Sequence, residues 1–239
     1  AKKGVEIASD LEEVQNVVDV AFGNSADAIN DWAKTATNAY GLSELSAKRW
    51  TGTMGAMLKS MQVSDDMTLQ MSTDLAGLAG DFASFYNLDH EEAWTKIRSG
   101  IAGETEPLKQ LGINMSVTNL EAFALKEGIK KTYSEMSQSE QTILRYNYLM
   151  SVTADAQGDF ARTSGSWANQ LRTAKLNLEN MSASIGKQLL PSLTNVLQTF
   201  NKAAEESSGD ARLFIANLDK VVEAGAQAAK EMLPVITSL

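Results

Sequence analysis

Apolar residues recur at helical spacing through the first part of the chain. One series occupies Met54, Met57, Leu58 and Met61. A second continues at steps of three and four through Met67, Met71, Leu75, Leu78, Phe82 and Phe85. Steps of three and four place these residues on one face of a helix. Methionine-rich surfaces can also bind partners adaptably, but these methionines lie on the apolar stripes, which favours packing in a core.

Helix starts are marked by an apolar residue followed by a short polar capping residue. The capping positions of this kind are Ser43, Ser64, Asp89, Ser116 and Ser137. Glu92 and Glu140 lie three residues after two of them, and Glu12 lies three residues after Ser9, so three capping boxes are predicted. Glycines 23, 41, 112 and 128 stand where helices should end. The pattern predicts a string of short helices from about residue 9 to residue 135.

Small residues cluster at positions 76–80, between Asp74 and Asp81. Such a cluster allows two helices to approach closely, as in membrane dimers. Because carboxylates flank it, close packing inside a folded domain is the favoured interpretation.

After about residue 160 the spacing changes to a heptad pattern. The predicted seam consists of Trp167, Leu171, Ala174, Leu178, Met181 and Ile185, at intervals of 4, 3, 4, 3 and 4. This spacing is typical of a helix that packs along a partner helix, and it slips by one residue at Leu189. A long helix in an ordinary bundle stays an alternative. Since one helix cannot bury its own stripe, the seam is predicted to drive self-association, or to be covered within the chain by Phe214, Val221 and Ala228.

A weak internal repeat relates residues 187–194 to residues 230–237. Each copy is predicted to be an apolar-striped helix that ends in a kink or restart at a proline, Pro191 in the first copy and Pro234 in the second. Repeated helices that stack on their neighbours suit an elongated protein.

Composition agrees with an all-α fold, because the chain has only 3 prolines and few aromatic residues. We predict an N-terminal helical segment at residues 1–40, a compact multi-helix core domain at residues 41–160, and a segment of long, partly coiled-coil-like helices at residues 161–239. The ends of the chain have the character of a fragment of a longer protein.

The net charge of −9 disfavours stable binding to nucleic acid, which carries phosphates of the same sign. The chain has no cysteine, which excludes disulfides and thiolate metal ligands and fits a reducing compartment. No stretch is long and apolar enough to predict a membrane segment.

Candidate chemistry is sparse. His90 is the only histidine, so no second histidine exists to complete a His-Glu-x-x-His metal site, and no nucleophile elbow accompanies it. Glu104 and Glu106 lie beside two glycines and could act as paired carboxylates of a glycosidase. However, Glu106 followed by Pro107 is also a typical helix start. We therefore expect no enzyme activity, no catalytic residue, no metal and no cofactor.

Four segments resemble the core region of phage tail tape-measure proteins. They are TGTMGAMLKSM at residues 51–61, GLAGDFASFYN at 77–87, RSGIAGETEPL at 98–108, and RYNYLM at 145–150 running on to GDFART at 158–163. Together they extend the resemblance over roughly residues 9–200, and the Leu-Leu-Pro turn after a long helix is similar to that family as well.

The resemblance implies a structural protein of the virion, located in the lumen of the tail tube and in the host cytoplasm during assembly. Its helical length would help to set tail length, and it would take part in tail assembly and genome delivery. The implied partners are further copies of itself, other tail proteins, tail-tube or tail-tip subunits, and tail assembly chaperones. The alternative is a helical interaction module of a phage tail or contractile injection machine that does not gauge length; an enzyme domain ranks third.

Overall fold

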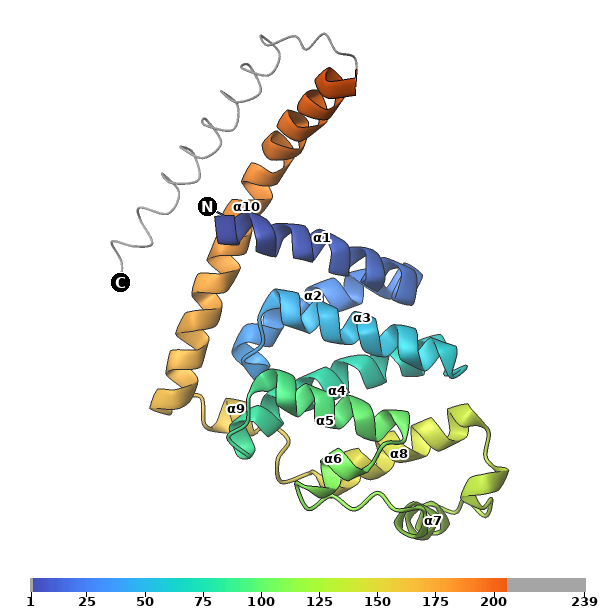
Figure 1. The fold of residues 1–239 in the computed structure, drawn as a ribbon. Coiled ribbons are helices and arrows are strands. Elements are labelled where there is room, and N and C mark those ends of the chain that lie inside the picture. Colours follow the sequence, from blue (N-terminus) through green and yellow to red (C-terminus); the bar gives the residue numbers. More distant parts are fainter. Residues whose placement is uncertain (1, 206–239) are drawn as a thin grey trace. The chain divides into compact units, whose positions relative to one another are not determined.

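The computed structural model describes residues 2–205 (Figure 1). In chain order the elements are α1 (Lys2–Phe22), η1 (Gly23–Ser25), α2 (Ala26–Tyr40), α3 (Glu44–Ser60), α4 (Asp65–Phe85), α5 (His90–Ala102), α6 (Glu106–Lys109), α7 (Val117–Lys126), η2 (Tyr133–Glu135), α8 (Gln138–Val152), α9 (Asp159–Arg162) and α10 (Trp167–Glu205). No strand occurs between residues 2 and 205, and the prediction of an all-α fold is confirmed.

The chain divides into two compact units by its contacts. The large unit comprises residues 14–177, and the small unit comprises, within the described range, residues 2–13 and 178–205. Helices α1 and α10 each contribute residues to both units.

Helix α4 is the centre of the large unit. It contacts α2, α3, α5 and α9, and Figure 1 shows α3, α4 and α5 side by side. Both methionine-containing stripes point into this core: Met54, Leu58, Met71 and Leu75 are fully buried. Met57, Met61 and Met67 are half-buried and pack against this core, which agrees with the core interpretation, and Phe85 at the end of the second stripe is exposed.

Most predicted helix starts coincide with observed N-caps. The Ser43 hydroxyl accepts a hydrogen bond from the Ser46 backbone N–H, and Ser116 does the same for Asn119. Ser137 and Glu140 form the full capping box. Asp89 caps α5 through the N–H of Glu91 and not through a capping box with Glu92. Gly41 ends α2 with a positive φ of 66°, which glycine adopts without the steric penalty of a side chain.

The predicted capping box at Ser9 and Glu12 is wrong. Ser9 lies inside α1, which begins at Lys2. Upstream of Ser9, Ile7 and Ala8 are buried, as is Leu11 after it. A helix that starts at Ser9 would leave Ile7 and Ala8 off the buried face, so their burial outweighs the local preference of serine for a cap.

The small-residue cluster at positions 76–80 packs against the end of α2. A Cβ atom placed on Gly80 would lie 2.2 Å from the backbone oxygen of Tyr40, and one on Gly77 would lie 2.9 Å from the Tyr40 ring. Two helices meet here with no room for a methyl group. Close packing inside the domain, as expected from the sequence, is what this cluster provides.

The small unit contains a second close helix crossing. A Cβ atom on Gly186 of α10 would lie 1.8 Å from the backbone oxygen of Gly4 in α1, and one on Gly4 would lie 2.4 Å from the oxygen of Ser182. Ala8 and Ala183 are buried beside this crossing. The backbones of α1 and α10 are therefore in direct contact in this unit.

Helix α10 runs without interruption from Trp167 to Glu205 and includes Pro191. The helix therefore does not restart at Pro191, and a kink at that residue stays a prediction. A proline removes one helical hydrogen bond and its ring crowds the carbonyl four residues earlier, yet α10 continues through it. The second copy of the repeat, at residues 230–237, and the residues Phe214, Val221 and Ala228 lie outside the described residues.

Candidate functional site

The predicted seam lies on α10, and much of it faces solvent. The exposed fraction is 82% for Trp167, 45% for Leu171 and 57% for Leu178. Ala174 is also exposed, whereas Met181 and Ile185 are half-buried. Within residues 2–205 no helix covers the first four seam positions, and an unburied tryptophan with two leucines at heptad spacing marks a face that can bind a partner helix.

The residues that flank this face carry little charge. At heptad spacing the flanking positions are Ala168, Gln170, Lys175, Asn177, Ser182 and Ser184. None of them is acidic, although the chain has 30 acidic residues. Two copies of a chain with a net charge of −9 could therefore approach along this face without facing carboxylates.

A polar cluster fastens the first turns of α10 within the large unit. Asn169 is 3% exposed, and its side-chain amide donates to the hydroxyl of Thr163 at 2.8 Å and to that of Ser84 at 3.2 Å. The two hydroxyls lie 3.0 Å apart. Arg172 donates to the Asn169 side-chain oxygen at 3.1 Å and to the backbone oxygen of Leu88 at 3.4 Å. We call these five residues the α10 anchor: Ser84, Leu88, Thr163, Asn169 and Arg172.

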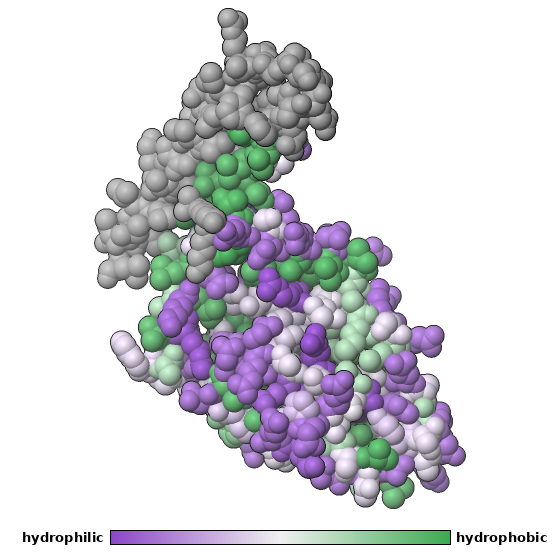
Figure 2. All heavy atoms as spheres, in the orientation of Figure 1, coloured by the Kyte–Doolittle hydropathy of each residue, from purple (hydrophilic) through white to green (hydrophobic). Residues whose placement is uncertain are grey.

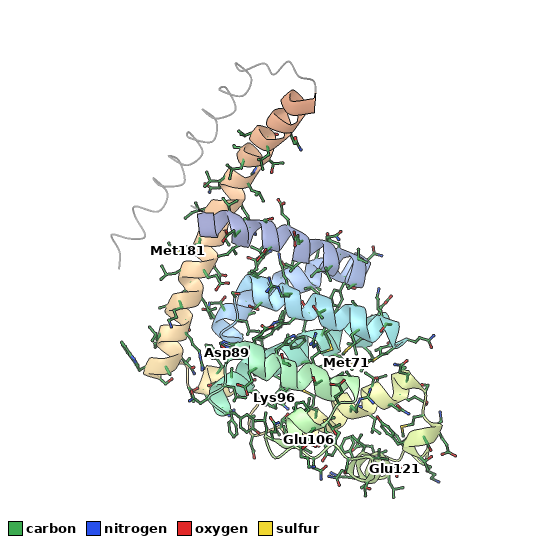
Figure 3. The ribbon with its side chains drawn as sticks, in the orientation of Figure 1. Met71, Asp89, Lys96, Glu106, Glu121 and Met181 are labelled. Atoms are coloured by element: carbon green, nitrogen blue, oxygen red, sulfur yellow. The ribbon has the colours of Figure 1, made fainter. Side chains whose placement is uncertain are left out.

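His90 lies next to the α10 anchor at the start of α5, where Figure 3 labels Asp89. Its Nε2 atom is buried and has no hydrogen-bond partner. Burial and the nearby Arg172 guanidinium lower the pKa of His90 to about 4, and the Asp89 carboxylate offsets part of that decrease. At neutral pH the imidazole is therefore uncharged.

Two further polar side chains in the core were not identified from the sequence. Asp81 is 3% exposed and accepts hydrogen bonds from the backbone N–H groups of Gly158 at 2.8 Å and Phe160 at 3.1 Å. Arg145 is 4% exposed and donates to the backbone oxygen of Ile101 at 2.8 Å. The sequence signal that could have identified Asp81 and Arg145 as buried is their position among apolar residues of a predicted helix.

The carboxylates considered for glycoside hydrolysis are not gathered in a cavity. Glu104 and Glu106 are both exposed, and Glu106 pairs with Lys109 at 3.4 Å. A cavity of about 240 Å³ is lined by residues that include Tyr40, Asp74 and Asp81. Asp81 is held by two backbone N–H groups, and Asp74 accepts a bond from the Tyr146 hydroxyl at 2.6 Å. These contacts give both carboxylates a role in holding the fold.

Two other kinds of site are absent from residues 2–205. No group of three or more metal-ligating side chains is close enough to hold a metal ion. No helix in this range is both long enough and apolar enough to span a membrane. In the view of Figure 2 the face of the large unit is mostly hydrophilic, with scattered apolar residues.

Comparison with protein-family models, with curated proteins and with solved structures finds no match to this chain. The fold and the candidate site therefore define its class only as an all-α protein with an exposed apolar helix face.

Proposed function

We propose that the chain is a non-catalytic, structural segment of a phage tail tape-measure protein. The observation that carries this proposal is the place of the four family-like segments in the fold. They lie on α3, on α4, across α5 and α6, and across α8 and α9. Helix α4 contacts α3, α5 and α9, and α5 contacts α6 and α8, so segments far apart in the sequence meet in one core.

Residues of these segments make the contacts between the helices. Gly80 meets the backbone of Tyr40, Asp81 binds the N–H groups of Gly158 and Phe160, and Arg145 binds the oxygen of Ile101. These residues of the family-like segments help to determine the fold, because the atoms packed around them leave room for few other side chains. This supports a shared architecture better than a resemblance confined to exposed loops would.

Helix α10 suits the proposed scaffold role. Its 39 residues extend about 58 Å at 1.5 Å per residue. The exposed seam would join copies of the chain, with Trp167, Leu171, Ala174 and Leu178 packed against the same face of a second copy. No acidic residue flanks the seam, so a second copy of this strongly acidic chain could pack there without repulsion between carboxylates.

The decisive experiment changes the length of the full tape-measure protein. In-frame deletions or duplications of its helical segments should shorten or lengthen the tail tube by about 1.5 Å per residue, as measured by electron microscopy. Removal of exposed loop residues of equal number serves as the control. Tubes of constant length across the series would overturn the proposal.

The exposed seam also favours a second candidate, a helical interaction module of a phage tail or contractile injection machine. In this case deletion of α10 would leave tube length unchanged and would abolish infection or partner binding. The same deletion series therefore separates the two functions.

A further inference from the structure

The α10 anchor connects α10 to the ends of α4 and α9 through a small number of hydrogen bonds. Asn169 and Arg172 come from α10, Ser84 and Leu88 from the end of α4 and the turn after it, and Thr163 from the end of α9. Of the seam residues on either side of Asn169, Trp167 is largely exposed and Leu171 is about half exposed. Apolar burial is therefore small at this point, and the polar contacts carry much of the attachment.

A cation in this attachment lies near the start of α5, where His90 is located. Arg172 reaches the Leu88 oxygen, two residues before His90, and is the positive charge that acts on the imidazole. Asp89 is the negative charge that acts on it. The other acidic residues of the first turn of α5 are engaged elsewhere: Glu91 accepts from the Trp50 indole at 3.2 Å, and Glu92 pairs with Lys96 at 3.4 Å.

We propose that the α10 anchor is an acid-sensitive latch, which opens when His90 takes up a proton. The charged imidazole would be a buried cation beside Arg172, with only Asp89 to offset it. Movement of Arg172 away from the Leu88 oxygen would relieve the repulsion, and at 3.4 Å that hydrogen bond is a long one. Asn169 then keeps only its bonds to Ser84 and Thr163, and the attachment of the first turns of α10 is weakened. The latch does not depend on the proposed function.

Acid should open the latch, because His90 is neutral when the latch is closed. In the closed latch the pKa of His90 is about 4, whereas a freed histidine has the ordinary pKa of 6.5. The open form therefore binds more protons as the pH falls from 6.5 towards 4, and closure is lost in that window. If opening frees His90 fully, the open population rises about 20-fold between pH 7 and pH 5.

Hydrogen exchange of the whole chain tests this latch. Exchange rates at pH 7 and pH 5, corrected for the intrinsic effect of pH, are compared for peptides that cover α10 residues 167–177 and for peptides from α4. We expect protection of the α10 peptides to fall by about 20-fold, with α4 unchanged. His90→Gln should abolish that decrease, and Arg172→Gln should leave the α10 peptides weakly protected at both pH values.

A second measurement keeps the test valid where a variant fails to fold. His90 is the only histidine, so its proton NMR signals need no assignment and report its pKa directly in the wild type. Latch opening must follow protonation of this one group. Equal loss of protection in wild type and His90→Gln, or an opening midpoint that does not track the titration of His90, would overturn the proposal.

Discussion

The carboxylate of Asp81, in the middle of α4, holds the backbone N–H of Phe160 at 3.1 Å although the two residues are 79 positions apart. Its other oxygen binds the N–H of Gly158. A buried carboxylate thus satisfies the donors at the start of a four-residue helix, α9, that is too short to be stable on its own.

Removing the Asp81 carboxylate should destabilise the large unit. Asp81→Ala leaves two buried N–H groups without an acceptor, and we expect the free energy of unfolding in urea to fall by about 2–4 kcal/mol. Asp81→Asn retains one acceptor oxygen and should lose about half as much. Exposed Asp155→Asn is the matched control, and equal stability of all three variants would contradict the assigned role.

A methyl group at Gly80 should be poorly tolerated. Because its Cβ would meet the Tyr40 backbone, Gly80→Ala must push α4 and α2 apart, at a cost of about 1–3 kcal/mol in the free energy of unfolding. Gly165 has open space around it, so Gly165→Ala should change stability by less than about 0.5 kcal/mol. Thermal unfolding of both variants checks the difference.

The Tyr146 hydroxyl should contribute stability that disappears in alkaline solution. Burial and the bond to Asp74 raise the pKa of Tyr146 above its usual value of 10.0. The contribution is therefore complete below pH 10 and declines as the pH rises through the folded-state pKa. Tyr146→Phe should lower the free energy of unfolding by about 1 kcal/mol at pH 7.

The difference between wild type and Tyr146→Phe should shrink above pH 10. Tyr148→Phe provides the comparison, since the Tyr148 hydroxyl binds the Asn114 oxygen at an exposed position where water can replace it. A pH-independent difference for Tyr146 would count against the assigned contact with Asp74.

Self-association through the seam can be tested without disturbing the core. Leu171 and Leu178 are 45% and 57% exposed, so changing both to Asp should leave the monomer folded. In a complex that buries both positions, the two charges should cost several kcal/mol of association free energy. We expect the wild type to show concentration-dependent sedimentation in analytical ultracentrifugation and the double variant to stay monomeric.

Thr194→Asp combined with Gln198→Asp is the control, because both positions are exposed on α10 and lie outside the seam. This variant should sediment like the wild type. A wild type that stays monomeric at high concentration would refute self-association of this chain.

The sequence predicted those helix ends that depend on interactions between residues close together in the chain. The capping box at Ser137 and the stop at Gly41 could be predicted because each uses groups a few residues apart. The same capping pattern at Ser9 gave a wrong prediction, because burial of Ile7 and Ala8 extends α1 upstream of Ser9. The two N–H groups that Asp81 binds lie 77 and 79 positions away, and the Ser84 partner of Asn169 lies 85 positions away, so nothing in the immediate sequence specifies those contacts.

Pro191 gives α10 an uneven mechanical response. Proline has no N–H to donate to the carbonyl four residues earlier, so one helical hydrogen bond is missing between residues 187 and 191. The stretches before and after it keep their full series of bonds. A bending load on α10 would therefore concentrate its strain in that single turn, and the helix behaves as two stiff rods joined by a compliant segment.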